Sequence, residues 1–172
     1  MELPEGVVLL DSLGDLESDN KSSILVCGSH CGGNSDLARQ VKNCHVKAVF
    51  LNNAGVGKNQ AGTRGLVHYE AEHILACAVD HDSAEIGVSR ETWDSGIISH
   101  INSLAKAAGI KIGDPVKTAV AKIVNNKTHL LSDSENNNTD DVGNNNLIGN
   151  SQKANLKKQK QIQFDGVKVT VT

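Results

Sequence analysis

The sequence predicts an α/β domain: a mainly parallel, open β-sheet with flanking helices and a C-terminal strand or hairpin at an edge. Three observations support this fold class. Short apolar runs each end in a polar, loop-forming cluster, helix-like segments lie between the runs, and aromatic residues are so few that aliphatic side chains must form the core. The apolar runs cover residues 24–27, 46–51 and 76–79, and their β-branched content and Gly or Asn boundaries are typical of buried parallel strands. Residues 7–11 predict a further strand.

Helix-like segments separate the predicted strands. Residues 35–41 begin with capping residues and place Leu37 and Val41 four positions apart. Residues 65–75 carry apolar side chains at helical intervals. Because strands alternate with helices, we expect right-handed βαβ crossovers and a parallel sheet.

The strongest helical periodicity covers residues 92–108. Its apolar side chains recur every three or four positions, at Trp93, Ile97, Ile101, Leu104 and Ala108. Gly109 follows as a C-terminal stop. A further short helix is expected after Asp114, with Pro115 at its first position.

The composition changes after Asn125. Residues 132–161 contain two runs of three asparagines, end in a lysine-rich stretch and hold few apolar residues. Such a segment buries too little surface to offset chain entropy, so it is predicted to be a disordered insertion. It separates an α/β domain of residues 1–131 from residues 162–172, where strict alternation predicts a strand that returns to the same domain.

Charge and composition argue against several classes of protein. Lys and Arg total 17 against 20 Asp and Glu, for a net charge of −3, so bulk positive charge for nucleic-acid binding is missing. No apolar stretch approaches the ~20 residues of a membrane-spanning helix. No signal peptide is recognisable, and the four cysteines are interpreted as thiols of a reducing compartment. We therefore expect a cytoplasmic protein that binds neither nucleic acid nor membrane.

Each predicted strand ends in residues suited to binding or catalysis. Because the carboxyl ends of parallel strands meet at one edge of a sheet, the three following loops are expected to form a single ligand site. The candidates for catalysis are Ser29, His30, His81 and Asp82, and those for ligand binding are Gly28, Gly32, Gly33, Asn52, Asn53, Gly55, Gly57 and Lys58.

These residue types indicate acid–base chemistry on a small molecule. Imidazole titrates near neutral pH, so His30 and His81 are the expected acid/base pair, with an aspartate beside His81 to orient a ring. Ser29 would supply a central hydroxyl. The glycines allow backbone N–H groups to turn towards an anion, and Lys58 adds positive charge. Alternatively, the glycines only make tight strand-to-helix turns.

Two nucleotide-binding motifs are incomplete. Residues 55–58 resemble part of a P-loop, but Asn52 and Asn59 stand where that motif needs Gly and Ser or Thr. Residues 52–55 match the Asn-Asn-Ala-Gly of short-chain dehydrogenases, yet lie too close to the first glycine-rich loop, and no Tyr-x-x-x-Lys follows. We therefore expect no cofactor, and hydrolytic or lyase chemistry rather than redox chemistry.

Two alternatives involve cysteine. Cys31 lies in a partial nucleophile elbow at residues 29–33, which makes it a possible nucleophile. The alternative is that Cys31 is only a small residue of the loop or the core. Cys27 and Cys31, with Cys77 and His81, give two possible ligand pairs on neighbouring strand ends. The paired C-x-x-C spacing of zinc sites is absent, so no metal is expected.

Several short motifs occur in order over roughly residues 7–124. They are Gly28-Ser29-His30 with Gly32-Gly33, Asn53-Ala54-Gly55-Val56-Gly57-Lys58 with Ala61-Gly62, Ser83 with Ile86-Gly87, and Gly96-x-Ile98-Ser99-x-x-Asn102. As a set they resemble a family of small bacterial α/β proteins of unassigned function. That family's pattern has G-S-H-G-G and N-D-A-G-V-G-K, whereas Cys31 interrupts the first motif here and Asn53 replaces the aspartate of the second. The resemblance implies the fold but no reaction.

Together, these features predict a small-molecule-binding α/β protein. The first interpretation is an enzyme of hydrolase or lyase type that acts on a small anionic or amide compound. The alternative is a non-catalytic ligand-binding or accessory subunit, or an inactive homologue. A small-molecule ligand is the expected partner, and a homo-oligomer is compatible with the sequence.

Overall fold

The computed structural model describes residues 2–18 and 24–135, which form a five-stranded sheet in the order β1-β2-β3-β4-β5. The strands are β1 (Val7–Leu10), β2 (Ile24–His30), β3 (Ala48–Asn52), β4 (Leu75–Val79) and β5 (Ile98–Ile101). The first four strands are parallel, and β5 pairs antiparallel with β4 at an edge. The predicted α/β class with a mainly parallel sheet is thus confirmed.

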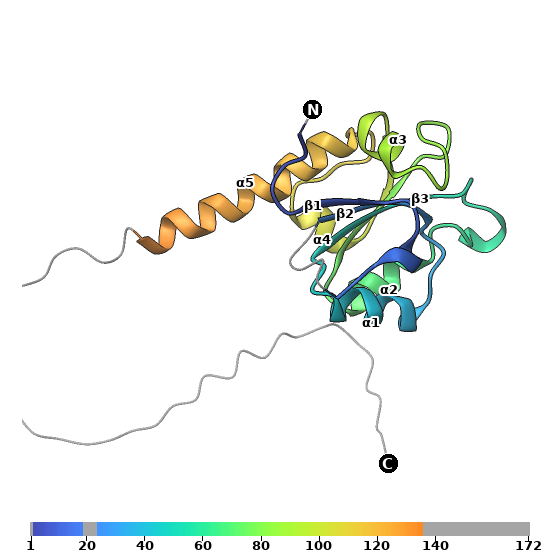
Figure 1. Ribbon diagram of the computed structural model, residues 1–172, viewed down its shortest axis with the longest axis horizontal. Helices are drawn as coiled ribbons and strands as arrows, with labels where there is room; N and C mark the ends of the chain where they lie inside the picture. Colours follow the sequence, from blue (N-terminus) through green and yellow to red (C-terminus); the bar gives the residue numbers. More distant parts are fainter. Residues whose placement is uncertain (1, 19–23, 136–172) are drawn as a thin grey trace, which may run out of the picture. The chain divides into compact units, whose positions relative to one another are not determined.

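Helices cover both faces of the sheet (Figure 1). The helices are α1 (Ser35–Asn43) and α2 (Gly65–Ala71) on one face, and α3 (Ser89–Asp94), α4 (Ser103–Ala107) and α5 (Val116–Glu135) on the other. Side chains alternate along each strand, so that Leu25 joins the α1–α2 core and Val26 joins the opposite core. Both faces of the central strands are therefore buried, as their nearly continuous apolar sequences predict.

The prediction of one helix over residues 92–108 is wrong. The chain leaves α3 after Asp94, forms β5 and then enters α4. Ile98 is buried in the sheet core, and Asn102 ends the strand. Asn102 caps α4 through the Ala105 N–H at 3.0 Å and donates to the Ile74 carbonyl at 2.9 Å. The apolar residues have helical spacing, but the β-branched isoleucines also suit a strand. Pairing with β4 therefore decides the structure of this segment.

The helix predicted after Asp114 is confirmed, and it is longer than expected. It begins at Val116 and continues to Glu135, and so crosses the boundary predicted at residue 132. The rest of the predicted insertion and the predicted strand at 162–172 lie outside the described residues. No helix in the described part of the chain combines the length and apolar character needed to cross a membrane.

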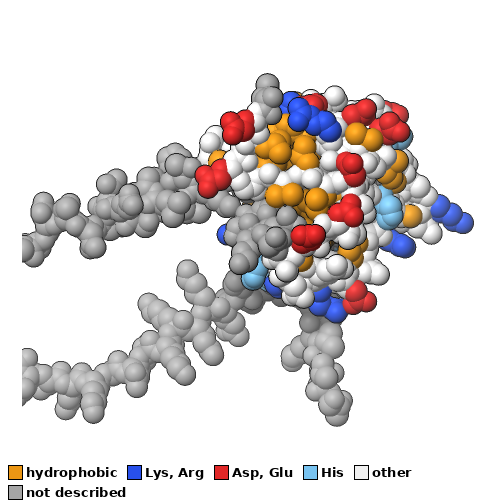
Figure 2. Space-filling view, viewed as in Figure 1, with side chains coloured by type: hydrophobic (Ala, Val, Ile, Leu, Met, Phe, Trp, Pro, Cys, Tyr) orange, Lys and Arg blue, Asp and Glu red, His pale blue; other side chains and the backbone are white. Residues whose placement is uncertain are grey.

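The surface carries charges of both signs. On the face shown in Figure 2, acidic and basic side chains are interspersed, with apolar atoms exposed between them. This mixture agrees with the near-balanced composition of the chain.

Candidate functional site

The carboxyl ends of β2, β3 and β4 lie side by side at one edge of the sheet. His30 at the end of β2 is paired with Asn52 of β3, and Asn52 is paired with Val79 of β4. The loops that follow β3 and β4 therefore start beside each other, with His30 one strand away. We call this region the carboxyl edge.

Asn53 connects the parts of the carboxyl edge. Its side chain is almost fully buried, with 3% of the residue exposed. Its Oδ1 accepts hydrogen bonds from the backbone N–H groups of Gly55 at 2.9 Å and His81 at 3.2 Å. Its Nδ2 donates to the Ser99 Oγ at 3.1 Å. Because two backbone donors face Oδ1, the orientation of the amide is defined, and Asn53 joins the loops after β3 and β4 to β5.

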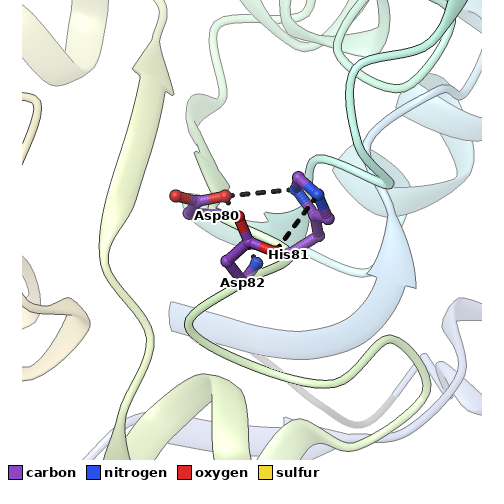
Figure 3. Close-up of side chains that lie close together, drawn as sticks. All are labelled: Asp80, His81 and Asp82. Atoms are coloured by element: carbon purple, nitrogen blue, oxygen red, sulfur yellow. Dashed lines mark hydrogen bonds and ion pairs between the residues drawn. The ribbon is translucent and has the colours of Figure 1, made fainter.

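The His81 ring faces the carboxylates of both neighbouring aspartates (Figure 3). Its Nδ1 is 3.0 Å from the Asn53 Oδ1 and 3.1 Å from the Asp80 Oδ1. Its Nε2 is 3.5 Å from the Asp82 Oδ1. Two oxygen acceptors lie 3.0 and 3.1 Å from Nδ1, whereas the acceptor at Nε2 is 3.5 Å away. The closer contacts therefore favour a neutral ring with its hydrogen on Nδ1 and its lone pair on Nε2. The side chain is 46% exposed, so this nitrogen is available to accept a proton or to bind a metal ion.

Asp80, His81 and Asp82 also form the group of described residues best placed to hold a metal ion. One ligand atom from each lies within 4.8 Å of the others. Two carboxylates and an imidazole match the ligand preferences of Zn²⁺ and of other divalent transition metals. The three residues are adjacent in sequence, and their polar atoms already interact with one another.

His30 lies beside a different part of the same edge. It lines a cavity of about 220 Å³ together with residues of the loop after β3. Its Nδ1 accepts a hydrogen bond from the Gly32 N–H at 3.0 Å, so the hydrogen of the neutral ring is on Nε2. Because β3 separates β2 from β4, His30 and His81 start about 10 Å apart along the edge. Within the described residues no hydrogen bond joins the two imidazoles.

The loop after β3 is strained, and its amides are used internally. Positive φ angles occur at Ala54, Gly55, Val56, Gly57, Asn59 and Gln60. For a β-branched residue such as Val56 this conformation is rare and costs free energy. The N–H groups of 54–57 donate to oxygens of Asn52, Asn53 and Gly55. The amides predicted to cradle an anion at Gly55 and Gly57 thus already have partners in the loop.

Gly28 lies within β2 rather than in the predicted loop. The Gly87 N–H donates to its carbonyl at 2.8 Å. A Cβ at Gly28 would lie 2.5 Å from the backbone of Gly87 and 2.6 Å from that of Val88. The glycine is therefore required for close packing of this segment on β2.

We expect Gly28→Ala to lower the free energy of unfolding by about 2–3 kcal/mol, because backbone atoms on both sides cannot move apart without disturbing the sheet. Urea unfolding measures this loss. Gly33→Ala is the matched control, since its added methyl would meet only the flexible Leu37 side chain. Equal losses in the two variants would contradict the packing role.

Three other predicted site residues, the catalytic candidate Ser29 and the ligand-binding candidates Asn52 and Lys58, have structural contacts or remain exposed. Ser29 accepts a hydrogen bond from the Leu13 N–H at 2.9 Å and therefore contacts the segment after β1. No hydrogen bond links Ser29 to an imidazole in the part of the chain that the structure describes. Asn52 is fully buried and donates to the Ala84 carbonyl at 2.9 Å. Lys58 is exposed on the short helix Lys58–Gln60 and forms no ion pair with a described residue.

The structure contradicts both cysteine alternatives. Cys31 is completely buried, and burial raises the pKa of its thiol to about 12. Such a thiol is protonated at neutral pH and is a poor nucleophile. Cys27 and Cys31 lie in the α1–α2 core, whereas Cys77 lies in the core on the opposite face of the sheet. These cysteines therefore cannot converge on a single metal ion.

We expect Cys31 to react with iodoacetamide about 1,000-fold more slowly in the native protein than in urea, because burial and the raised pKa both suppress the thiolate. Mass spectrometry of labelled peptides resolves each cysteine. Cys44, which is 7% exposed, provides the comparison and should react first. Rapid native labelling of Cys31 would contradict the burial that the fold imposes.

Ser99 and His100 are site residues that sequence reasoning missed. Ser99 Oγ donates to the Ala78 carbonyl at 3.1 Å and accepts from Asn53. His100 Nδ1 lies 3.0 Å from the same Oγ, so it acts as a donor when the serine hydrogen is directed at Ala78. One network, His81–Asn53–Ser99–His100, thus orients two imidazoles. The sequence signal for these two residues was the Ile98-Ser99-x-x-Asn102 motif, which lies inside the segment predicted to be a helix.

Comparison with known proteins adds no further assignment. No protein-family model, curated protein or solved structure matches the chain.

Proposed function

We propose that this protein is an enzyme in which His81 acts as a general base on a small polar compound at the carboxyl edge of the sheet. The observation that carries the proposal is the pair of contacts from His81 Nδ1 to Asn53 and Asp80. They hold the ring in one orientation and leave Nε2 as the basic nitrogen. A positioned general base typically contributes about 100- to 10,000-fold to a reaction rate.

The surroundings of His81 support proton transfer. Nε2 takes a proton from a bound water or from the substrate, and the imidazolium that forms lies between two carboxylates. Asp80 is 3.1 Å from Nδ1, and Asp82 is 3.5 Å from Nε2. Each ring nitrogen therefore has a carboxylate oxygen within 3.5 Å that can accept its hydrogen.

This arrangement favours hydrolysis by an activated water, or elimination by a lyase, over covalent catalysis. Nucleophilic catalysis by a serine requires a base within hydrogen-bond reach of its hydroxyl. Ser29 instead contacts Leu13. The substrate class remains the small anionic or amide compound that the sequence predicts, with exposed Lys58 as the cation of the loop.

A ligand-binding protein without catalytic activity is the second candidate. The specific observation in its favour is that the N–H groups of residues 54–57 are already hydrogen-bonded within the loop. They are therefore not available to stabilise an oxyanion, which many acyl-transfer enzymes require.

A paired screen separates the two candidates. The protein is incubated with small amides, esters, lactams and hydroxy acids, and both thermal stabilisation and product formation are recorded. An enzyme converts at least one compound, whereas a binding protein is stabilised by compounds that it leaves unchanged. Repeating the screen with EDTA shows whether a metal ion held by Asp80, His81 and Asp82 is needed.

A further inference from the structure

A groove lies between α2 and β5, and His81 is not among the residues that line it. The groove has a volume of about 370 Å³. Residues of α2 and of the segment before it line one wall, and His100, Ile101 and the exposed Ile112 line the other. This volume lies within the range of pockets that bind small molecules.

The groove presents apolar side chains to solvent. Val67 on α2 and Ile112 are each 66% exposed, the highest values among the large apolar side chains that the structure describes. Leu66 and Ile101 continue this apolar lining. A ligand with an apolar body would therefore cover apolar side-chain surface that is otherwise exposed to water.

The groove also holds a cation without an ion-pair partner. Within the described residues, the Arg64 side chain makes one long hydrogen bond of 3.4 Å, from Nε to the Gly32 carbonyl, and no ion pair with a carboxylate. Glu70, the acidic residue of the lining, accepts two hydrogen bonds from Ser103. One of its oxygens accepts from the Ser103 N–H at 2.9 Å and the other from the Ser103 hydroxyl at 2.7 Å. These bonds hold the pKa of Glu70 below its usual value, so Glu70 is ionised at neutral pH and an anionic ligand is attracted by Arg64 rather than by this end of the groove.

His100 supplies a further polar contact. Its Nδ1 faces Ser99, so Nε2 is the nitrogen left for a ligand in the groove. A guanidinium binds a carboxylate through two parallel hydrogen bonds, which makes Arg64 better suited to a planar anion than a lysine would be.

We propose that this groove binds a small carboxylate with an apolar body. The carboxylate contacts Arg64, and the apolar body lies against Val67 and Ile112. His81 does not line the groove, although Gln60 of the loop after β3 and His100 of the His81–Asn53–Ser99–His100 network do. The contacts proposed for the ligand are made by Arg64, Val67 and Ile112, none of which belongs to that network.

The test uses the full-length protein and two probes of matched size, 4-phenylbutyrate and its neutral amide 4-phenylbutyramide. Titrations followed by ¹H–¹⁵N NMR should give saturable shifts at Val67, His100 and Ile112 with the carboxylate. We expect Arg64→Gln to weaken carboxylate binding at least about 10-fold, because a charge-assisted hydrogen-bonded pair is lost, and to leave amide binding unchanged. Arg90→Gln, an exposed substitution on the opposite face, is the matched control.

Two outcomes would overturn the proposal. One is absence of saturable shifts in the groove, including the case in which the carboxylate shifts only residues near Lys58. The other is an equal effect of Arg64→Gln and Arg90→Gln on carboxylate affinity. In His81→Gln the carboxylate should bind as in the wild type, so failure of the catalytic proposal does not affect the result.

Discussion

Replacing His81 with glutamine should lower kcat/KM by about 100- to 10,000-fold on any compound that the protein converts. Glutamine retains an amide that can hydrogen-bond to Asn53 or Asp80, but it has no nitrogen that accepts a proton at neutral pH. Because the His81 side chain is 46% exposed, the free energy of unfolding should change by less than about 1 kcal/mol. Steady-state kinetics and urea unfolding measure the two effects separately.

His68→Gln is the matched control, because it makes the same exchange on α2, away from the carboxyl edge. Its kcat/KM should equal that of the wild type. If His81→Gln keeps more than a third of wild-type turnover, His81 is not the base.

Replacing Asn53 with leucine should lower the free energy of unfolding by about 3 kcal/mol. Leucine has a similar volume but leaves the N–H groups of Gly55 and His81 without their acceptor, and each unsatisfied group of this kind costs about 1–3 kcal/mol. Turnover should also fall, because the His81 ring loses the oxygen that orients it. Chemical denaturation and kinetics on the same preparation measure both losses.

Asn43→Leu makes the same substitution at the exposed end of α1 and should cost less than about 0.5 kcal/mol. If Asn53→Leu were as stable as this control, Asn53 would not be the residue that connects the loops of the carboxyl edge.

The strands of the sheet could be predicted because their signals are local. Runs such as 24–27 and 46–51 combine β-branched residues with Gly or Asn boundaries, and this combination suits only a buried strand. The strand β5 could not be predicted in this way, since its apolar spacing also fits a helix. What selects the strand is pairing with β4 and the hydrogen bond from Asn102 to the Ile74 carbonyl, which are contacts between distant parts of the chain.

The location of the site could be predicted better than the role of each residue. Parallel order alone brings the loops after β3 and β4 together, and the structure shows Asn53 in contact with Asp80 and His81. The strand β2, however, continues three residues beyond its predicted end, to His30. Ser29 therefore belongs to the strand, where alternation turns neighbouring side chains to opposite sides and its hydroxyl reaches Leu13.

The tautomer of His81 tests the central claim most directly. Long-range ¹H–¹⁵N correlation spectra of uniformly ¹⁵N-labelled protein, recorded at a pH where the ring is neutral, distinguish a protonated from an unprotonated ring nitrogen. The signal that disappears in His81→Gln identifies the residue. The contacts with Asn53 and Asp80 lead us to expect the hydrogen on Nδ1 and a free lone pair on Nε2. A neutral ring with its hydrogen on Nε2 would contradict the proposed role of His81 as the base.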